Sequence, residues 1–444
     1  MAPEELSVTQ AAQQLGVSRQ RVHQLIKSGA LRAHKIGNSW AVDTESVQAR
    51  LAHGVRPGRP AAKLPDQQNY TLMNAEYEVL DFSYDRANHH FSASHSIHDA
   101  SRAPLGVVSE TGRYASASAL YEWWRHRTIP IEREGLDTKL IELGVDSPAE
   151  IPFASLGLSL SDQYWIRPES ARELRWQDLN FFDNAFENPE GGWLESVGGD
   201  RTPDNTSEGQ LSKKWVCRGA DRVLLKGGDG HPQVPLNEKI ATLLHQRILN
   251  PGEYVAYEVE QFGQAPVSSC KSFLTRREEY IPAWYLRPHG KRADGRHALN
   301  AYLETCESLG AANAEELLSK MLVCDYLIAN TDRHWRNFGL IRNIDTLEFR
   351  IAPLFDDGNS LWHSAPLRSL QAGNFYFESK PFNKDSIRQL LMTPDIDWLD
   401  IDALDGFAEE AEELLGKDDE TTPRAPYVAR GIAHDIEQVR IRLL

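Results

Sequence analysis

The stretch 327-LIANTDRHWRNFGL-340, followed by 352-APLFDDG-358, carries the strongest pattern in this sequence. Its apolar, helix-like start ends at Asn330, and a polar turn then carries Asp332 and, five residues later, Asn337. Residues 338–341 have the character of a strand, and a second carboxylate, Asp356, follows another apolar run. The stretch therefore predicts a helix, a polar loop, a strand and an acidic turn, in that order.

Two carboxylates and an amide at these separations are typical of enzymes that transfer a phosphoryl group as protein kinases do. That reaction needs one carboxylate to orient the attacking hydroxyl and accept its proton, and we predict this role for Asp332. It also needs an amide and a carboxylate to hold Mg²⁺ on the nucleotide phosphates, which we predict for Asn337 and Asp356. Because Asp, Asn and Gly are common turn formers, a plain loop is the alternative. The segments upstream argue against that alternative.

Length and composition limit the class of protein. With 444 residues the chain can form two or three domains, and its 41% hydrophobic and 25% charged residues are typical of soluble globular proteins. No run of 18 or more apolar residues predicts a membrane span, and the acidic start lacks the apolar core of a signal peptide. The four cysteines form no Cys-x-x-Cys pair, which favours reduced thiols in the cytoplasm over a disulfide framework or a zinc site.

The net charge of −16 is distributed unevenly along the chain. Residues 1–63 contain nine Lys and Arg against four Asp and Glu, a net charge of +5, so the remainder carries −21. A small basic segment before a large acidic one indicates that nucleic acid binds the first segment and not the second. Chance variation in a short segment is the alternative.

The first segment has the pattern of a helix-turn-helix. Ser7 and Gln10 can form a capping box for a helix over residues 8–15, and a turn at residues 16–18 leads to a second helix over residues 19–27. Long hydrogen-bonding side chains without an acid cover the second helix, which in this geometry enters the major groove. The predicted DNA-binding residues there are Ser18, Arg19, Gln20, Arg21, His23 and Gln24.

A hairpin and a closing helix complete this segment. Residues 31–42 predict two short strands that turn at Gly37 and Asn38, with Lys35 on a wing that contacts the DNA backbone and Trp40 beside it. The segments 8-VTQAA-12, 15-LGVSRQRVHQLI-26 and 29-GAL-31 resemble the winged helix-turn-helix of excisionase and MerR-type DNA binders. A trihelical protein-binding module is the alternative. One such domain makes few phosphate contacts, so tight binding favours a homodimer on paired half-sites.

Residues 55–65, rich in Pro, Gly and Arg, predict a linker between the DNA-binding domain, residues 1–54, and the body of the chain.

In the body, a turn over residues 205–212 carries Thr206, Ser207 and Gly209 and leads into a strand that starts near Lys213. Backbone N–H groups of such a turn can cover nucleotide phosphates, although with a single glycine a plain hairpin is the alternative.

Lys226 ends the next apolar strand, where a kinase keeps the lysine that contacts the nucleotide phosphates. A buried strand end rarely carries a lysine without a partner, and Glu238, in the following helix, is the predicted partner. An exposed Lys226 and a Glu238 that only favours a helix N-terminus are the alternatives. We place the hinge between the two lobes, where backbone groups would meet the adenine, at Ser272 and Phe273. We interpret residues 159–166 as structural packing.

Taken in order, these elements resemble the HipA-like serine/threonine kinases, the toxins of toxin–antitoxin modules. The resemblance rests on 207-SEGQLSKK-214, Lys226, 237-NE-238, 330-NTDRHWRNFG-339 and 353-PLFDDG-358, and it lacks the His-Arg-Asp and Asp-Phe-Gly strings of common protein kinases. It implies an α+β, two-lobed, protein-kinase-like fold behind the small winged domain. Residues 66–272 would form the N-lobe with an N-terminal extension, and residues 273–444 a helical C-lobe.

The resemblance also implies an activity. It implies ATP and Mg²⁺ as cofactors and transfer to a Ser or Thr hydroxyl of a protein, with aminoacyl-tRNA synthetases among the targets of the family. It further implies self-silencing by phosphorylation of the glycine-containing loop, at Ser207 with Thr206 and Ser212 as neighbours, because phosphate there would repel the nucleotide phosphates. Unlike a kinase silenced by a separate antitoxin, this chain carries its own DNA-binding domain, which favours a self-regulating kinase.

Two other functions are compatible with the same residues. One is a transcription regulator whose kinase-like body only senses nucleotide, although the intact Asp332, Asn337, Asp356 and Lys226 argue for catalysis. The other is a kinase of the same fold that acts on small molecules or lipids. The acidic body argues against anionic lipid surfaces and against a membrane partner.

Overall fold

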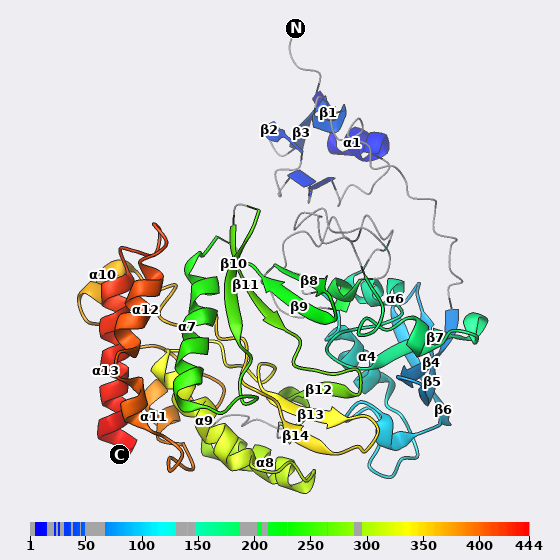
Figure 1. The fold of residues 1–444 in the computed structure, drawn as a ribbon. Helices are drawn as coiled ribbons and strands as arrows, with labels where there is room; N and C mark the ends of the chain where they lie inside the picture. The colour runs from blue at the N-terminus through cyan, green and yellow to red at the C-terminus, as the bar shows by residue number, and fades with distance from the viewer. Residues whose placement is uncertain are drawn as a thin grey trace. The chain divides into compact units, whose positions relative to one another are not determined.

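The computed structural model describes residues 5–15, 22–23, 25–26, 31–36, 39–44, 46–48, 67–129, 140, 145, 147–186, 202–206, 212–228, 230–263, 265–287 and 295–443. The chain divides into two compact units, residues 1–64 and residues 65–444, and each is described by itself. Both contain helices and strands (Figure 1), so the chain is α+β, as the sequence predicted.

The first unit is a small sheet with helices against it. Strands β1 (Glu5–Ser7), β3 (Ser39–Asp43) and β2 (Ala33–Ile36) pair antiparallel in that order. Helix α1 (Val8–Leu15) begins with the predicted capping box, in which the Gln10 N–H donates to Ser7 Oγ over 3.2 Å and the Ser7 N–H to Gln10 Oε1 over 2.9 Å. The helix and the hairpin are thus confirmed. Strand β1 was not predicted, because three residues show no alternation.

The second unit begins with an antiparallel sheet in the order β6-β5-β4-β7. Its strands are β4 (Gln67–Asn74), β5 (Tyr77–Asp85), β6 (His90–Ile97) and β7 (Tyr164–Pro168). Helix α4 (Ala117–Arg125), capped by Ser116, packs against this sheet, and the short helix α6 (Ile151–Ala154) lies nearby. Buried aromatic side chains fill the space between them, among them Phe82, Phe91, Trp124 and Tyr164.

A second antiparallel sheet has the order β10-β11-β9-β8. Its strands are β8 (Lys213–Arg218), β9 (Asp221–Lys226), β10 (Tyr257–Phe262) and β11 (Ala265–Lys271). Helix α7 (Gln233–Ile248) joins β9 to β10 and packs against β10 and β11 (Figure 1). The sheet therefore brings the end of β9 close to the first turns of α7.

The rest of the unit is mostly helical around a third sheet, β12 (Glu278–Pro282), β13 (Gly339–Asn343) and β14 (Phe349–Ile351). Its helices are α8 (Gly295–Ser308), α9 (Ala314–Leu327), α10 (Leu367–Gln371), α11 (Ser386–Leu390), α12 (Phe407–Leu415) and α13 (Ala425–Leu443). Short 3-10 helices lie at Ala100–Arg102, Pro148–Glu150, Glu169–Ala171, Trp176–Asp178, Pro203–Thr206, Ala283–Tyr285 and Ile401–Leu404. Within the C-lobe that was expected to be helical, residues 273–444, the chain is broken between α8 and α9 by Gly310 and Asn313, which have positive φ angles.

Polar contacts join the first sheet of this unit to the third. The Asn74 side chain donates to Glu279 of β12 over 2.7 Å, and Arg277 pairs with Glu76 over 2.9 Å. The buried Glu279 also accepts from Arg342 of β13 over 2.6 Å. Because Asn74 and Glu279 are almost completely buried, these contacts fix how the first sheet of this unit lies against β12 and β13.

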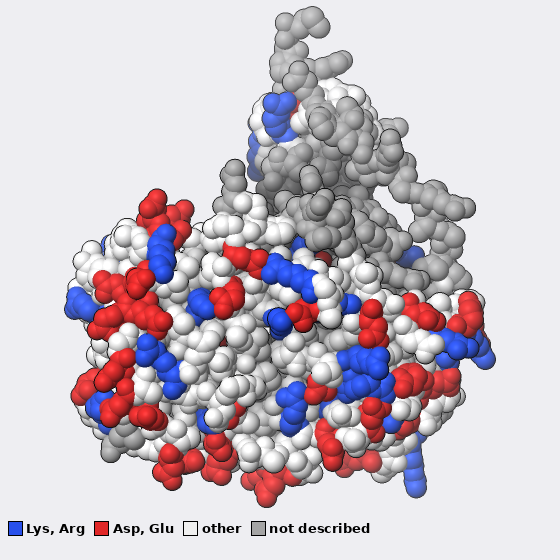
Figure 2. Space-filling view, in the orientation of Figure 1, with Lys and Arg blue, Asp and Glu red and all other residues white. Residues whose placement is uncertain are grey.

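The surface of the second unit is acidic over its C-terminal helices. Figure 2 shows Asp and Glu side chains gathered at the left of the view, over the helices at the end of the chain. Glu409, Glu412 and Glu413 of α12 are exposed, so this face of the helix is in contact with solvent. In the described part of the chain, no helix has both the length and the apolar character that a membrane span needs.

Candidate active site

Lys226 is the last residue of β9 and is 2% exposed. Its Nζ forms ion pairs with Glu238 of α7 and, over 2.5 Å, with Asp356, which follows β14. Burial alone would lower the pKa of this ammonium group, but the two carboxylates outweigh it and raise the pKa above its usual value. Lys226 is therefore held as a cation, and the alternative of an exposed lysine at a strand end is wrong.

The two carboxylates around Lys226 differ in their environment. Glu238 is completely buried, and burial raises its pKa even though Lys226 opposes this; its Oε2 accepts the Asp357 N–H over 2.9 Å. Burial also disfavours the charge of Asp356, but Lys226 and Lys213 outweigh it and lower the pKa of Asp356. The two carboxylates that contact Lys226 thus have pKa values shifted in opposite directions.

The backbone around Asp356 turns sharply. Asp356 has a φ angle of +66°, in the left-handed region. Two residues on, a Cβ at Gly358 would lie 2.9 Å from Cγ1 of Val234 and 3.3 Å from Oε1 of Glu238. The turn therefore needs glycine there, so that the acidic segment can lie directly against α7.

Asp332 lies in the loop between α9 and β13, and its position is fixed from three sides. The Asn330 side chain accepts the Asp332 N–H over 2.8 Å, and the Asn359 side chain donates to Asp332 Oδ2 over 3.1 Å. Lys380 lies 2.9 Å from the other oxygen, Oδ1. The carboxylate is about one-third exposed, so a substrate hydroxyl can reach it.

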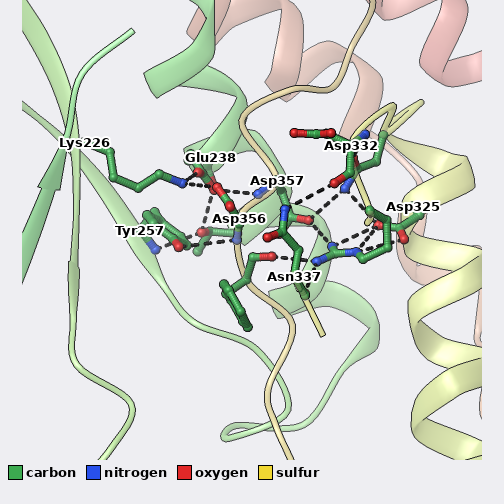
Figure 3. A network of polar contacts seen from close by, with 12 residues as sticks. Lys226, Glu238, Tyr257, Asp325, Asp332, Asn337, Asp356 and Asp357 are labelled. Atoms are coloured by element: carbon green, nitrogen blue, oxygen red, sulfur yellow. Dashed lines mark hydrogen bonds and ion pairs between the residues drawn. The ribbon is translucent and has the colours of Figure 1, made fainter. Parts of the chain in front are cut away.

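Arg333, the residue after Asp332, is completely buried and holds the loop in place. Its guanidinium lies 2.9 Å from Asp325 of α9 and 2.5 Å from Asp357. It also donates to the backbone carbonyls of Asn337, over 2.8 Å, and Phe355, over 2.6 Å. One side chain thus ties α9, the catalytic loop and the acidic turn together, and Figure 3 shows Asp357 between Lys226 on one side and Asp325 and Asp332 on the other.

Asn337 and Asp356 have the donor atoms that a magnesium ion needs. Asn337 is 6% exposed, and its side-chain N–H₂ donates to the Asp332 carbonyl over 3.1 Å, which leaves its side-chain oxygen on the opposite side of the amide. No group of three or more His, Cys, Asp or Glu that could form a metal cage occurs among the residues described. Mg²⁺ is usually held by one or two protein oxygens together with substrate phosphates and water, so the pair fits this ion.

One cavity of about 600 Å³ brings these residues together. Lys226, Asp332, Asn337 and Asp356 all line it, and its volume lies in the range of small-molecule and cofactor sites, roughly 300–1,000 Å³. The other predicted residues that line it are Thr206, Lys213, Ser272 and Phe273. Glu238 is not among the residues that line the cavity, but it forms an ion pair with Lys226, which is. Ser207 and Gly209 lie outside the described residues.

Comparison with known proteins is more informative for the first unit of the chain than for the second. Residues 5–54 match the model of a helix-turn-helix domain family. No curated protein matches the sequence. One similar solved structure is that of a proinflammatory kinase, CtkA, from Helicobacter pylori, with 18% sequence identity and a TM-score of 0.38 over 52% of this chain and 93% of that one. A TM-score this low assigns neither a fold nor an activity.

The family match supports DNA binding by the first unit. Of the predicted contact residues that are described, His23 and Lys35 are both exposed, and Lys35 Nζ lies 5.5 Å from the centre of the Trp40 ring. The remaining predicted contact residues lie outside the described part of the chain: Ser18, Arg19, Gln20, Arg21 and Gln24.

The predicted hinge lies at the wall of the cavity. The Ser272 N–H donates to the Arg222 carbonyl over 2.7 Å, and the Phe273 ring lies 5.3 Å from that of Phe355 and contacts Tyr280. These rings give the wall an apolar surface suited to a planar base. Thr206 instead donates its hydroxyl to the Leu158 carbonyl over 3.0 Å and is buried.

The interpretation of residues 159–166 as packing alone was incomplete. Trp165 and Ile166 are buried, but residues 159–162 and Tyr164 line the cavity. So do Trp123 and Arg127, which precede the catalytic loop by some 200 residues in the sequence. The dense mixture of aromatic and polar residues in 159–166 is the sequence feature that could have indicated that this segment lines the cavity.

The N-terminal extension, residues 67–186 of the described chain, also contacts the loop between α9 and β13 directly. Arg336 hydrogen-bonds to His126, the residue that follows α4, and its guanidinium lies 4.9 Å from the centre of the Trp284 ring. Burial, together with the charges of Arg336 and Arg125, lowers the pKa of His126 to about 3, so this imidazole is neutral and can accept the hydrogen bond.

Proposed function

We propose that residues 65–444 form an ATP- and Mg²⁺-dependent serine/threonine protein kinase of the HipA type, and that the first unit binds DNA to regulate it. One observation carries the proposal: Lys226, Asp332, Asn337 and Asp356 line a single cavity of nucleotide size. Their contacts agree with the roles that the chemistry requires, because Lys226 is buried as a cation and Asp332 is accessible. An aminoacyl-tRNA synthetase as substrate, and a homodimer on DNA, belong to the same proposal.

The chain's own residues account for the steps of this reaction. Asp332 orients a Ser or Thr hydroxyl and accepts its proton as the oxygen attacks the γ-phosphorus. Lys226, kept in place by Glu238, contacts the nucleotide phosphates. Asn337 and Asp356 would hold Mg²⁺, which neutralises negative charge on those phosphates. Phe273 and Phe355 shield the base from water.

Incubation with γ-labelled ATP and Mg²⁺ tests the proposal. We expect label on Ser207, Thr206 or Ser212 of the wild-type protein, or on a protein in an added cell extract, and a loss of about 10²–10⁴-fold in rate in Asp332→Ala, because the general base is gone. Mass spectrometry locates the label, and intact mass shows whether the sample was already phosphorylated. Nucleotide binding without transfer by an unphosphorylated sample would overturn the kinase in favour of a nucleotide-sensing regulator.

A small-molecule kinase is the second candidate, and the shape of the cavity favours it. Trp123, Arg127 and Tyr164 of the N-terminal extension line the cavity together with Asp332 and could enclose a small acceptor. The same incubation, with an extract of small metabolites added, separates the two. Label in the small-molecule fraction and none on protein would replace the protein-kinase proposal.

Lys35→Ala tests the DNA-binding part. We expect weaker binding to any mixed-sequence duplex and a salt dependence of log K that is shallower by about one, because one phosphate contact is lost. Arg32→Ala is the matched control, because Arg32 is already paired with Asp43 over 3.0 Å. Fluorescence anisotropy over a salt series measures both; an unchanged slope for Lys35→Ala would show that Lys35 does not contact the phosphates.

A further inference from the structure

We propose that Lys380 is a further catalytic residue, which contacts the γ-phosphoryl group as it passes to the acceptor hydroxyl. The proposal rests on the kinase activity proposed above. Lys380 lies 48 residues after Asp332 in the sequence, yet its Nζ is 2.9 Å from Asp332 Oδ1. It is therefore a cation in direct contact with the predicted base.

The backbone that carries Lys380 is fixed against the catalytic loop. The Gln389 side chain donates to the Lys380 carbonyl over 2.6 Å, and its oxygen accepts the Phe382 N–H over 2.9 Å. Phe382 is completely buried, and its ring lies 5.3 Å from that of Trp335, three residues after Asp332. The lysine is thus placed by a packed segment, while its side chain remains 51% exposed toward solvent.

The other basic side chains near this position are held by other partners, and Arg336, in the same loop, hydrogen-bonds to His126. Arg333 is completely buried in contacts to Asp325 and Asp357. The Nδ1 atom of His334 accepts the Arg336 N–H over 3.3 Å. Lys226 is paired with Glu238 and Asp356 on the other side of the acidic turn. The charge that spreads over the oxygens of the transferred group needs a cation near the attacking oxygen, and Lys380 is placed to supply it.

The step balances without further reactants. The acceptor oxygen forms a bond to the γ-phosphorus as the bond from phosphorus to the bridging β-phosphate oxygen breaks, and the hydroxyl proton passes to Asp332. ADP leaves with the bridging oxygen. Lys380 keeps its proton throughout and moves from Asp332 Oδ1 toward the phosphoryl oxygens, where negative charge accumulates before transfer is complete.

Binding of a transition-state mimic tests the proposal without relying on turnover. ADP, Mg²⁺ and aluminium fluoride imitate the planar transferred group, so calorimetry should show that Lys380→Ala weakens binding of this mixture about 10²–10³-fold and leaves binding of ADP and Mg²⁺ alone within about twofold. We expect kcat to fall by a similar factor with little change in KM for ATP. Lys380→Arg should restore part of both losses.

Lys384→Ala is the matched control, since Lys384 is an exposed lysine of the same segment. It should behave like the wild type in every measurement. Equal binding of the aluminium fluoride mixture by Lys380→Ala and the wild type would overturn the proposal, and so would a rise in kcat, which would mean that Lys380 blocks the base. If instead the wild type binds ADP and transfers nothing to any acceptor, the kinase proposal itself fails.

Discussion

Replacing Arg333 with alanine is expected to lower the free energy of unfolding by about 3–5 kcal/mol, because it leaves buried carboxylates without their counter-charge. Arg333 is completely buried, with Asp325 2.9 Å away and Asp357 2.5 Å away. It also satisfies the carbonyls of Asn337 and Phe355, which would lose their partner. Urea unfolding of the variant and the wild type measures the loss.

The loss should depend on pH in a defined direction. Burial raises the pKa of Asp325 from 3.8 to about 6, although Arg333 opposes the rise. A carboxyl whose folded pKa is raised stabilises the fold below its unfolded pKa, and that contribution disappears as the pH rises through the folded value. Without Arg333 the folded pKa of Asp325 rises further, so Arg333→Ala should lose more stability at pH 8 than at pH 5.

Arg333→Lys is the matched control for this experiment. It keeps the positive charge but cannot form the fork that reaches both carboxylates and both carbonyls at once, so we expect an intermediate loss. A loss below about 1 kcal/mol in Arg333→Ala at pH 8 would contradict the assigned role, because that is the range of a surface ion pair. Far-UV circular dichroism confirms that both variants are folded before unfolding begins.

Lys226→Met is expected to reduce kcat by about 10²–10³-fold, the loss typical of removing one preorganised group that stabilises developing charge. Methionine has a similar length and no charge, so the cavity keeps its shape while the nucleotide phosphates lose their cation. Nucleotide affinity should also fall, because Glu238 and Asp356 then face the phosphates without Lys226 between them. Steady-state kinetics and calorimetry with ADP measure the two effects.

Glu238→Gln separates the contribution of position from that of charge. It keeps Lys226 paired with Asp356 and removes only the negative charge of the completely buried partner, so we expect a smaller loss than in Lys226→Met. The double variant should cost less than the sum of the single changes, because both act through one ion pair. Additive effects on kcat would show that Glu238 does not position Lys226.

The sequence predicted those parts of the candidate site that depend on local pattern. Lys226 could be recognised because a charged residue ends an apolar strand, and Glu238 because a helix follows it at once; the structure brings the two together. The loop with Asp332 and Asn337 was predicted from the spacing of these residues together with the segments upstream that carry Lys226 and Glu238. In the first unit, the capping box at Ser7 and the hairpin followed from residue preferences within a few positions.

Contacts between distant segments could not be predicted in this way. Lys380 contacts Asp332 across 48 residues, and Trp123 of α4 and Arg127 just after it line the same cavity although they lie some 200 residues before Asp332. Arg333 looked like one more polar loop residue, because burial is a property of the packed chain and not of its neighbours in the sequence. The break between α8 and α9 was missed because Gly310 and Asn313 interrupt a hydrophobic pattern that continues on both sides.

The ion pair between Lys226 and Asp356 has a consequence for the order in which ligands bind. A divalent cation that binds Asp356 competes with Lys226 for the same carboxylate, and phosphate groups that bind Lys226 compete with Asp356 for the same ammonium. Each ligand therefore removes the competitor of the other, and thermodynamic linkage requires that each raises the affinity of the other by the same factor. If the chain binds ATP and Mg²⁺ as proposed, this ion pair therefore favours their complex over either component alone.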